Sequence, residues 1–511
     1  MDKTNGTPFS LKLLSDGFHA SLFQYFTAAV ASIFNFLSLI YVLKKLAVGE
    51  FGFYNFLLAA VFFIQTVSFL GTDAIIQRYL PEYEETGNNY LKKRVLAFGM
   101  LLCLLSLSVV LSAVFLARAK IAAAFNLPLH SAKLFSLIAA ITLLSTESYL
   151  LGDIAMVSLF KNLYWSLCSI AYSFVKLVSF YLAFRMHCGI NGILTGWLIS
   201  EGLLFALLTA KACRDIFFLP VRKEDIVKLP LKRFFDFAKF LYFHKLTQFF
   251  RRKGLDIFLI SYFLGQREVG VYSVCFGIPL LLMQLSPANK LHPILKTISI
   301  RNYTKEKDTG NFFYLFSFLN RITYFLMIPL FVFSMVLADK IILFLLNPAY
   351  AGSAGLFRLS LAFIAVHQFG FVYTPLLFTL ERTKIIFITG LISLLNLALD
   401  LILIPLYGVP GAVLATGVTG IAIILYFRYA TGRIIPLSYP WKSFAVFSIN
   451  ISLAAVPLFL LRPLIKDLFA LACASLCAVS VYLAVSFFNK GFEDKDREII
   501  NKTVGRKIWV F

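Results

Sequence analysis

Long apolar stretches separated by short polar segments dominate the chain, and this feature most constrains its fold. A helix needs about 20 predominantly apolar residues to cross a bilayer, and fourteen stretches qualify. They run over approximately residues 18–43, 54–77, 95–117, 134–157, 164–184, 190–210, 236–263, 270–295, 312–337, 354–379, 385–405, 409–427, 443–461 and 467–489. Hydrophobic residues make up 59% and charged residues 14% of the sequence, which excludes a water-soluble enzyme. We expect an all-α polytopic membrane protein with about 14 transmembrane helices.

The polar segments carry unequal positive charge on the two sides of the predicted membrane. Fourteen spans put both termini on one side, where the segments hold 29 of the 48 Lys and Arg residues, whereas the opposite loops hold 10. Since cytoplasmic loops are enriched in Lys and Arg, this ratio predicts that both termini are cytoplasmic. The net charge of +22 is therefore interpreted as topological bias, and no nucleic-acid partner is expected.

The sequence repeats itself with a period near 220 residues. Three short patterns recur in the same order at offsets of 218 to 222, at 49–54 and 268–272, at 189–192 and 408–411, and at 126–135 and 347–357. They predict two pseudo-symmetric six-helix lobes, residues 1–213 and 214–430, followed by two additional helices and a cytoplasmic tail in residues 431–511. Parallel repeats of this kind are typical of transporters. A duplicated membrane scaffold without transport is the alternative.

Three local patterns resemble a known family. They are Leu46-Ala-Val-Gly-Glu-Phe-Gly-Phe-Tyr54, then Asp256-Ile-Phe-Leu-Ile-Ser-Tyr-Phe-Leu-Gly265 leading into Val269-Gly-Val-Tyr272, and the stretch from Asn396 to Ala412. The chain is similar to the polysaccharide-transporter branch, the O-antigen (Wzx-type) flippases, of the multidrug/oligosaccharidyl-lipid/polysaccharide exporter superfamily. Turn residues in the third pattern, from Pro405 to Gly411, also predict a tight turn between two spans.

The resemblance implies a flippase with fourteen helices in the bacterial cytoplasmic (inner) membrane. It would move undecaprenyl-pyrophosphate-linked oligosaccharides to the outer leaflet for O-antigen and lipopolysaccharide biosynthesis, as a monomeric transport unit among membrane lipids. A polysaccharide polymerase and glycosyltransferases would be its partners. The related lipid II flippases carry arginines in their first helix. Span one has only His19 at its edge, which counts against lipid II as the cargo.

Nine basic residues fall inside the predicted spans: Lys176, Lys239, Lys245, Arg251, Arg252, Lys253, Lys290, Arg321 and Arg358. Facing lipid, each would cost roughly 2.5–3.5 kcal/mol at the bilayer centre. They must therefore face a watery interior, snorkel, or pair with carboxylates. Six acidic residues could serve as such partners: Asp73, Glu147, Asp153, Glu201, Asp256 and Asp400. The surplus of cations suits an anionic cargo such as a pyrophosphate, since Arg and Lys both bind phosphate.

Span seven holds five of the nine cations, and as one helix it would place Lys245, Arg252 and Asp256 on one stripe. We expect Arg251 and Arg252 to contact the pyrophosphate, with Asp256 holding Arg252 in the absence of cargo. Three further cations would supply field or contacts, namely Lys245, Lys253 and Lys290, and Arg321 completes the predicted substrate-binding set. The alternatives are a helix break at Gly254, which makes residues 236–250 an interfacial helix, and a structural ion pair for Arg321.

The sequence contains no recognisable motif for catalysis, nucleotide binding or metal binding. It contains no Walker or dinucleotide-binding loop, and its six His show no metal spacing, so we expect no enzyme activity, no cofactor and no metal site. Residues 493–497 are interpreted as a solvated helix face. Two alternative functions stay open. A multidrug or cation antiporter should have an acidic cavity, and a membrane-embedded glycan polymerase or ligase should have an external loop larger than the 16 residues of 118–133.

Overall fold

The computed structural model describes residue 27, residues 30–504 and residue 510, apart from residues 128–131, 160, 223–225, 250–252, 285–309, 347, 381, 435–436 and 438. Every regular element within these ranges is helical, which confirms the predicted all-α class. The described residues form two compact units, residues 24–270 and residues 271–511. We call them the N-terminal and the C-terminal unit and treat each by itself.

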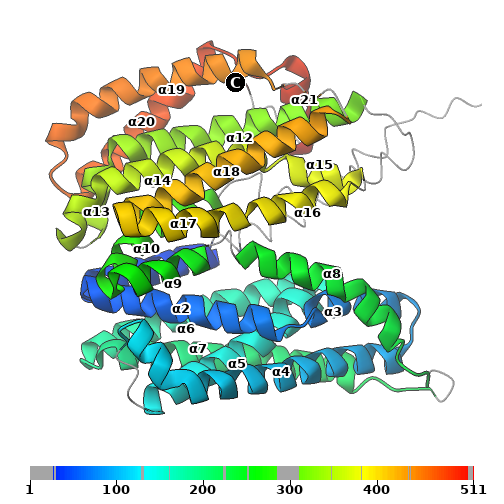
Figure 1. Cartoon of the computed structure of the whole chain (residues 1–511). Helices are drawn as coiled ribbons and strands as arrows, with labels where there is room; N and C mark the ends of the chain where they lie inside the picture. The colour runs from blue at the N-terminus through cyan, green and yellow to red at the C-terminus, as the bar shows by residue number, and fades with distance from the viewer. Residues whose placement is uncertain are drawn as a thin grey trace, which may run out of the picture. The chain divides into compact units, whose positions relative to one another are not determined.

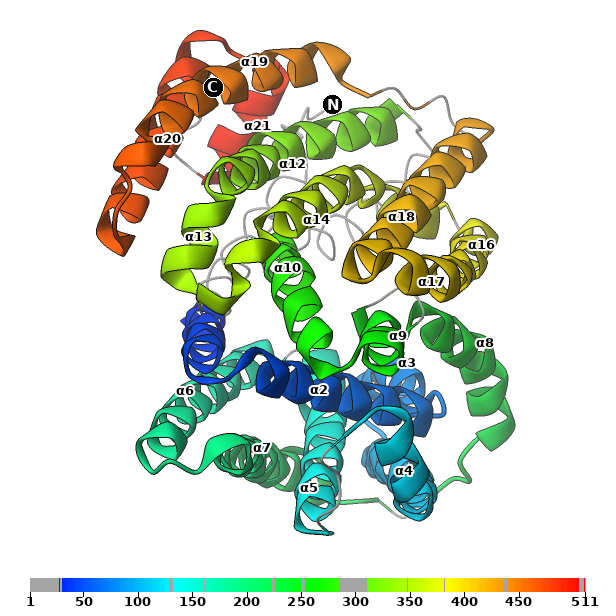
Figure 2. The same cartoon turned by 60° about the vertical axis from the view of Figure 1, so that its left-hand side comes forward.

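The N-terminal unit is a bundle of antiparallel helices that begins with a helix over residues 30–45. Its further elements are α2 (Val48–Ser68), α3 (Thr72–Glu85), α4 (Asn89–Ala124), α5 (Ala132–Tyr149), a π-helix (Leu150–Met156), α6 (Asn162–Arg185), α7 (Gly189–Ala212), a second π-helix (Cys213–Phe217), α8 (Leu231–Phe249) and α9 (Lys253–Leu264). Helices α6 and α7 pack closely as a hairpin (Figure 2) because small residues line their contact. A Cβ atom on Gly196, for example, would lie only 2.9 Å from Ser179 Cβ.

The C-terminal unit contains most of α10 (Gln266–Gln284) and the helices that follow it along the chain (Figure 1). These are α12 (Gly310–Val336), α13 (Ala338–Leu345), α14 (Ala354–His367), α15 (Tyr373–Thr379), α16 (Thr383–Ile392), α17 (Leu394–Tyr407), α18 (Val409–Gly432), α19 (Trp441–Leu461), α20 (Leu468–Phe488) and α21 (Asp494–Val504). Aromatic and aliphatic side chains of α12, α19 and α20 form one of its cores, around Phe325, Phe447 and Tyr482.

Eleven helical segments of the described residues are long and apolar enough to cross a membrane, so the chain is a multi-pass membrane protein. They correspond to predicted spans two to six and nine to fourteen. Predicted spans one and eight reach into residues outside the described ranges. Span seven is described as α8 and α9, which flank residues 250–252. The single helix expected over residues 236–263 stays a prediction, because residues 250–252 lie outside the described ranges.

The N-terminal unit ends at residue 270, a division by packing that does not test the lobe boundary predicted from the repeat at residue 213. Helices α8 and α9 belong to the N-terminal unit because α8 packs on α2 and α3, and α9 packs along α2. Phe258 of α9 places its ring 5.2 Å from that of Phe56 on α2, and Gly52 allows the α2 backbone to meet the carbonyl of Gln266. The division into repeats at residues 213 and 430 stays a prediction.

The turn expected between Pro405 and Gly411 is confirmed. Helix α17 ends at Tyr407 and α18 begins at Val409, and the two helices pack side by side (Figure 1). Gly408 joins them with φ of +66° and ψ of −143°, a conformation that side-chain-bearing residues avoid. A Cβ atom on Gly411 would lie 2.1 Å from the Leu403 carbonyl oxygen, so glycine is required for this tight packing.

Candidate functional site

A break in the second predicted span creates a polar position inside the N-terminal unit. Helix α2 ends at Ser68 and α3 begins at Thr72, because Leu70 and Gly71 adopt φ values of +47° and +81°. Gly71 also permits a close approach, since a Cβ atom there would lie 2.8 Å from Ala238 Cβ on α8. The new helix begins with Asp73 in its first turn, where the helix dipole favours a carboxylate.

Lys245 of α8 is the cation that meets this carboxylate. Its Nζ lies 2.6 Å from Asp73 Oδ2, 4.0 Å from the centroid of the Phe69 ring and 5.3 Å from that of Tyr149. The Lys245 side chain is 27% exposed and that of Asp73 15%, so the pair is partly shielded and still accessible. We call this arrangement of Lys245, Asp73, Phe69 and Tyr149 the Lys245 site.

Helix α8 is fixed against α2 and α3 by contacts of residues that precede Lys245 on α8. The Tyr242 hydroxyl donates to the carbonyl of Val67 at 3.0 Å. Toward the start of α8, the rings of Phe234 and Tyr79 lie 4.5 Å apart, and Arg233 pairs with Glu82 at 3.0 Å. These contacts hold Lys245 where the α2–α3 break leaves room for its ammonium group.

A second carboxylate lies close to the same place. Glu147, in the last turn of α5, is 1% exposed, and within the described ranges neither of its carboxylate oxygens has a hydrogen-bond partner. Glu147, Asp73 and Lys245 all lie within electrostatic range of the buried Cys103 thiol on α4. The π-helix that follows Glu147 is an arrangement often found at functional sites.

A third polar group occupies the α6–α7 hairpin. Lys176 Nζ lies 5.5, 5.7 and 5.8 Å from the ring centroids of Tyr172, Phe180 and Trp197, so three aromatic faces surround it. Glu201, which is 6% exposed, accepts hydrogen bonds of 2.9 Å from the Tyr172 hydroxyl and from Trp197 Nε1. Lys176 and Glu201 also attract each other electrostatically. These contacts account for both charges as links between α6 and α7.

The structure describes part of the predicted substrate-binding set. Arg251, Arg252 and Lys290 lie outside the described residues, and Lys253 begins α9 with its side chain outside them. Of the others, Lys245 pairs with Asp73, and Asp256 is buried in α9 at 1% exposure. Lys239, for which snorkelling was one expectation, forms an exposed 2.9 Å pair with Asp236.

Arg321 belongs to the C-terminal unit, where it forms ion pairs. Its Nε lies 2.8 Å from Asp496 Oδ2, and a terminal guanidinium nitrogen pairs with Glu493. Asp496 is fully buried and also accepts a hydrogen bond of 2.5 Å from the Tyr314 hydroxyl. The interpretation of residues 493–497 as a solvated helix face is therefore wrong for Asp496, because a buried arginine on α12 binds that side of the segment.

The sequence alone indicated only some of the residues around the Lys245 site. Asp73 and Glu147 were identified as possible counter-charges, but nothing in the sequence pairs Asp73 with Lys245, which lies 172 residues later. The nearest local signal is Asp73, which follows Gly71 and Thr72 within an apolar stretch, because acidic residues are rare inside transmembrane spans.

Comparisons with known proteins give a family and a fold. The family described as "Polysaccharide biosynthesis protein" matches residues 46–354, which is more than half of the chain. No curated protein matches significantly. The structure resembles "Lipid II flippase MurJ, inward closed conformation", with a TM-score of 0.66 and 16% identity, covering 91% of this chain and 98% of that one.

Two further solved structures share the arrangement of helices. An inward-facing multidrug resistance MATE family transporter of the MOP superfamily has a TM-score of 0.61 and 13% identity, covering 78% of this chain and 94% of that one. A MOP superfamily transporter from Pyrococcus furiosus has a TM-score of 0.55 and 14% identity, covering 84% and 98%. At these identities the likeness shows the fold, which is that of the MOP superfamily transporters.

Proposed function

Because the chain belongs to the polysaccharide biosynthesis protein family, we propose that it is a flippase for lipid-linked oligosaccharides. Its cargo would be an oligosaccharide on undecaprenyl pyrophosphate, moved across the bacterial cytoplasmic membrane for a surface polysaccharide such as O-antigen. The two repeats, residues 1–213 and 214–430, would alternate access to the cargo, with both termini in the cytoplasm. Glycosyltransferases would supply the cargo, and a polymerase would consume it.

The Lys245 site is the observation that carries this proposal. The ammonium group of a lysine side chain that is 27% exposed is held inside a bundle of apolar helices by one carboxylate and two aromatic rings. Holding a charge there costs free energy. Intramembrane charges are therefore rare, and they concentrate on substrate paths. A cation at this position would attract a negatively charged pyrophosphate more strongly than it would attract a neutral lipid.

The pairing of Lys245 with Asp73 suggests how cargo binds and leaves. Without cargo, Asp73 neutralises the ammonium at 2.6 Å. An arriving diphosphate competes with Asp73 for Lys245, and Asp73 takes Lys245 back when the cargo departs. Binding therefore exchanges one anion for another, which limits the net electrostatic gain and permits release. Arg251 and Arg252, which follow Lys245 by six and seven residues, would add bidentate contacts to the phosphates.

Deletion of the gene in the native bacterium tests the function. We expect surface polysaccharide to disappear and undecaprenyl-linked oligosaccharide to accumulate on the cytoplasmic side, measured by mass spectrometry of extracted lipids. A deletion strain with unchanged surface polysaccharide and no accumulated intermediate would contradict the proposal. The deletion strain with the wild-type gene restored serves as the reference and should recover its surface polysaccharide.

Variants of the Lys245 site test the mechanism in the same strain. Lys245→Met should abolish complementation at normal membrane abundance, whereas Lys239→Met on the same helix should complement fully, since the pair of Lys239 with Asp236 is exposed to solvent on both sides. The exchanged pair Asp73→Lys with Lys245→Asp distinguishes a structural ion pair from a cation that binds cargo. It restores the ion pair but inverts the order of charges. Full activity of the exchanged pair would make the site purely structural.

A cation antiporter is the second candidate because Glu147 and Asp73 place two carboxylates near one lysine. An organic cation would pair with Glu147, whereas a diphosphate would be repelled by it. The discriminating measurement is efflux of a fluorescent organic cation from cells that overproduce the protein. We expect no efflux above that of the empty strain, and efflux that is lost in Glu147→Gln would favour the antiporter.

A further inference from the structure

A groove with a cavity volume of about 380 Å³ lies between α16 and α18 in the C-terminal unit. It is found at the end where α16 begins and α18 ends, on the opposite end of these helices from the Gly408 turn. Its size falls within the range of small-molecule sites. The Lys245 site belongs to the other unit, so this groove is separate from the residues on which the proposed function rests.

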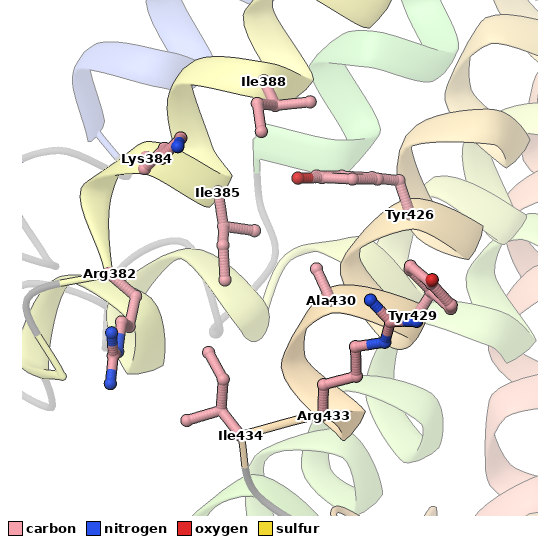
Figure 3. A pocket seen from close by; sticks show the side chains of 9 residues that line it. All are labelled: Arg382, Lys384, Ile385, Ile388, Tyr426, Tyr429, Ala430, Arg433 and Ile434. Carbon is pink, nitrogen blue, oxygen red and sulfur yellow. The ribbon is translucent and has the colours of Figure 1, made fainter.

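The groove combines an apolar interior with a cationic rim (Figure 3). Ile385 of α16 and Ile434 beyond α18 point into the space between the helices, and the ring of Tyr426 extends across it toward Ile388. Most of the surface that the lining residues present to the groove is apolar. Three cations, Arg382, Lys384 and Arg433, surround this interior, and among the described residues that line it none is acidic.

The rim cations differ from the other charges of the C-terminal unit in their surroundings. Arg321 and Arg358 are each bound by a carboxylate. In contrast, the described residues form no ion pair with Arg382, Lys384 or Arg433, all of which are exposed. The Arg433 guanidinium instead lies 4.3 Å from the centroid of the Tyr429 ring (Figure 3). A guanidinium that stacks on an aromatic ring keeps its N–H donors available, so it can still bind an anion.

We propose that this groove binds the headgroup of an anionic glycerophospholipid. The phosphate would contact Arg382, Lys384 and Arg433, and the start of an acyl chain would lie on Ile385, Ile388 and Ala430. Tyrosines such as Tyr426 and Tyr429 concentrate at the level of lipid headgroups, which is where a phosphate with an attached apolar chain is found. Charge complementarity selects an anionic lipid, since each nearby Lys or Arg favours it over a zwitterionic one.

The test uses the full-length protein in vesicles that contain a photoactivatable phosphatidylglycerol at low mole fraction. After illumination, mass spectrometry of peptides locates the attached lipid. We expect attachment to concentrate in residues 382–388 and 426–434, with much less from a phosphatidylcholine probe of the same chains. The triple variant Arg382→Gln, Lys384→Gln, Arg433→Gln should lower attachment there by roughly fivefold for each cation removed.

Two matched variants separate a built groove from a charged surface. Arg118→Gln, Lys120→Gln, Lys466→Gln removes three exposed cations elsewhere and should leave attachment unchanged. Ala430→Trp fills the groove without changing any charge and should abolish attachment, and a preserved melting temperature confirms that the variant is folded. Attachment retained in Ala430→Trp would refute the groove as the site.

The source of the phosphate is settled by competition with the same vesicles. Inorganic phosphate should not displace the probe, because it lacks the apolar chain, and unlabelled phosphatidylglycerol should displace it fully. Displacement by a short-chain prenyl diphosphate at lower concentration than by phosphatidylglycerol would assign the groove to the cargo and overturn the proposal. Equal attachment of the anionic and zwitterionic probes would overturn it as well.

Discussion

Replacing Asp496 with asparagine should release helix α21 from α12. Asp496 is fully buried and faces Arg321, which is 2% exposed, with two contacts of 2.8 and 3.2 Å. Tyr314 donates a further hydrogen bond to the same carboxylate. The substitution keeps the shape of the side chain and removes its charge, so a buried guanidinium is left with the more exposed Glu493 as its counter-charge.

The expected change in the free energy of α21 docking follows from the burial of the Arg321–Asp496 pair. Removing one partner of a buried ion pair costs about 3–5 kcal/mol. Because Glu493 still reaches Arg321, we expect the lower end, about 3 kcal/mol, which raises the population of undocked α21 by roughly a hundredfold. Glu493→Gln is the matched comparison. Its side chain is 60% exposed, so its pair is screened by solvent and its loss should cost at most about 1 kcal/mol.

Thiol labelling measures this population. Ile500 of α21 packs, partly buried, against the core around Phe325 and Phe447, so a cysteine placed there by Ile500→Cys in a cysteine-free background reacts faster when the helix undocks. When opening and closing are fast, the labelling rate follows the equilibrium population of the open form. We expect Asp496→Asn to label roughly a hundredfold faster than the parent and Glu493→Gln to label within about fivefold of it.

The reasoning would be refuted by equal labelling of the two variants, since it rests on the difference in burial between the two carboxylates. A second check removes both charges together. Arg321→Met combined with Asp496→Leu leaves no uncompensated charge in the buried interior, since the remaining Glu493 is exposed, so it should label more slowly than Asp496→Asn. Faster labelling of the double variant would mean that the charges themselves hold α21 in place.

Three further predictions concern packing, topology and a buried carboxylate. Gly411→Ala should lower the stability of the purified protein by about 1–3 kcal/mol, seen as a lower melting temperature, while Gly432→Ala, where a Cβ meets nothing within 4 Å, should change it little. In single-cysteine variants, an impermeant maleimide should label exposed Cys188 from outside whole cells and leave Cys213 unlabelled, and the reverse pattern would invert the topology. Glu201→Leu should destabilise by about 1–3 kcal/mol, because two buried donors lose their acceptor, and Glu201→Gln should be milder.

Features written into local sequence could be predicted well. Apolar stretches of sufficient length indicated the membrane class and most spans, since hydrocarbon leaves helices as nearly the only spanning option. The turn between α17 and α18 was likewise evident, because Gly408 and Gly411 each meet a requirement of backbone conformation or close packing. In such cases the cause lies within a few residues of the effect.

Features that depend on partners distant in sequence could not be predicted. Lys245 and Asp73 meet across 172 residues, and Arg321 meets Asp496 across 175, so the sequence offered several counter-charges without choosing one. The error over the tail has the same origin. Its alternating charges are typical of a solvated helix, and Asp496 is turned inward by the buried Arg321 and by Tyr314, both on another helix.

The Arg321–Asp496 pair also sets an order of events during synthesis. The arginine leaves the ribosome 175 residues ahead of its carboxylate, which at 5–20 residues per second is a delay of roughly 10–35 s. Throughout that time α12 must enter the membrane with an uncompensated guanidinium, one to two turns from the start of its apolar segment at Phe316. The nascent C-terminal unit is therefore incomplete until residues 493–496 have emerged, and a ribosome that stalls after α20 leaves a charged intermediate for membrane proteases to recognise.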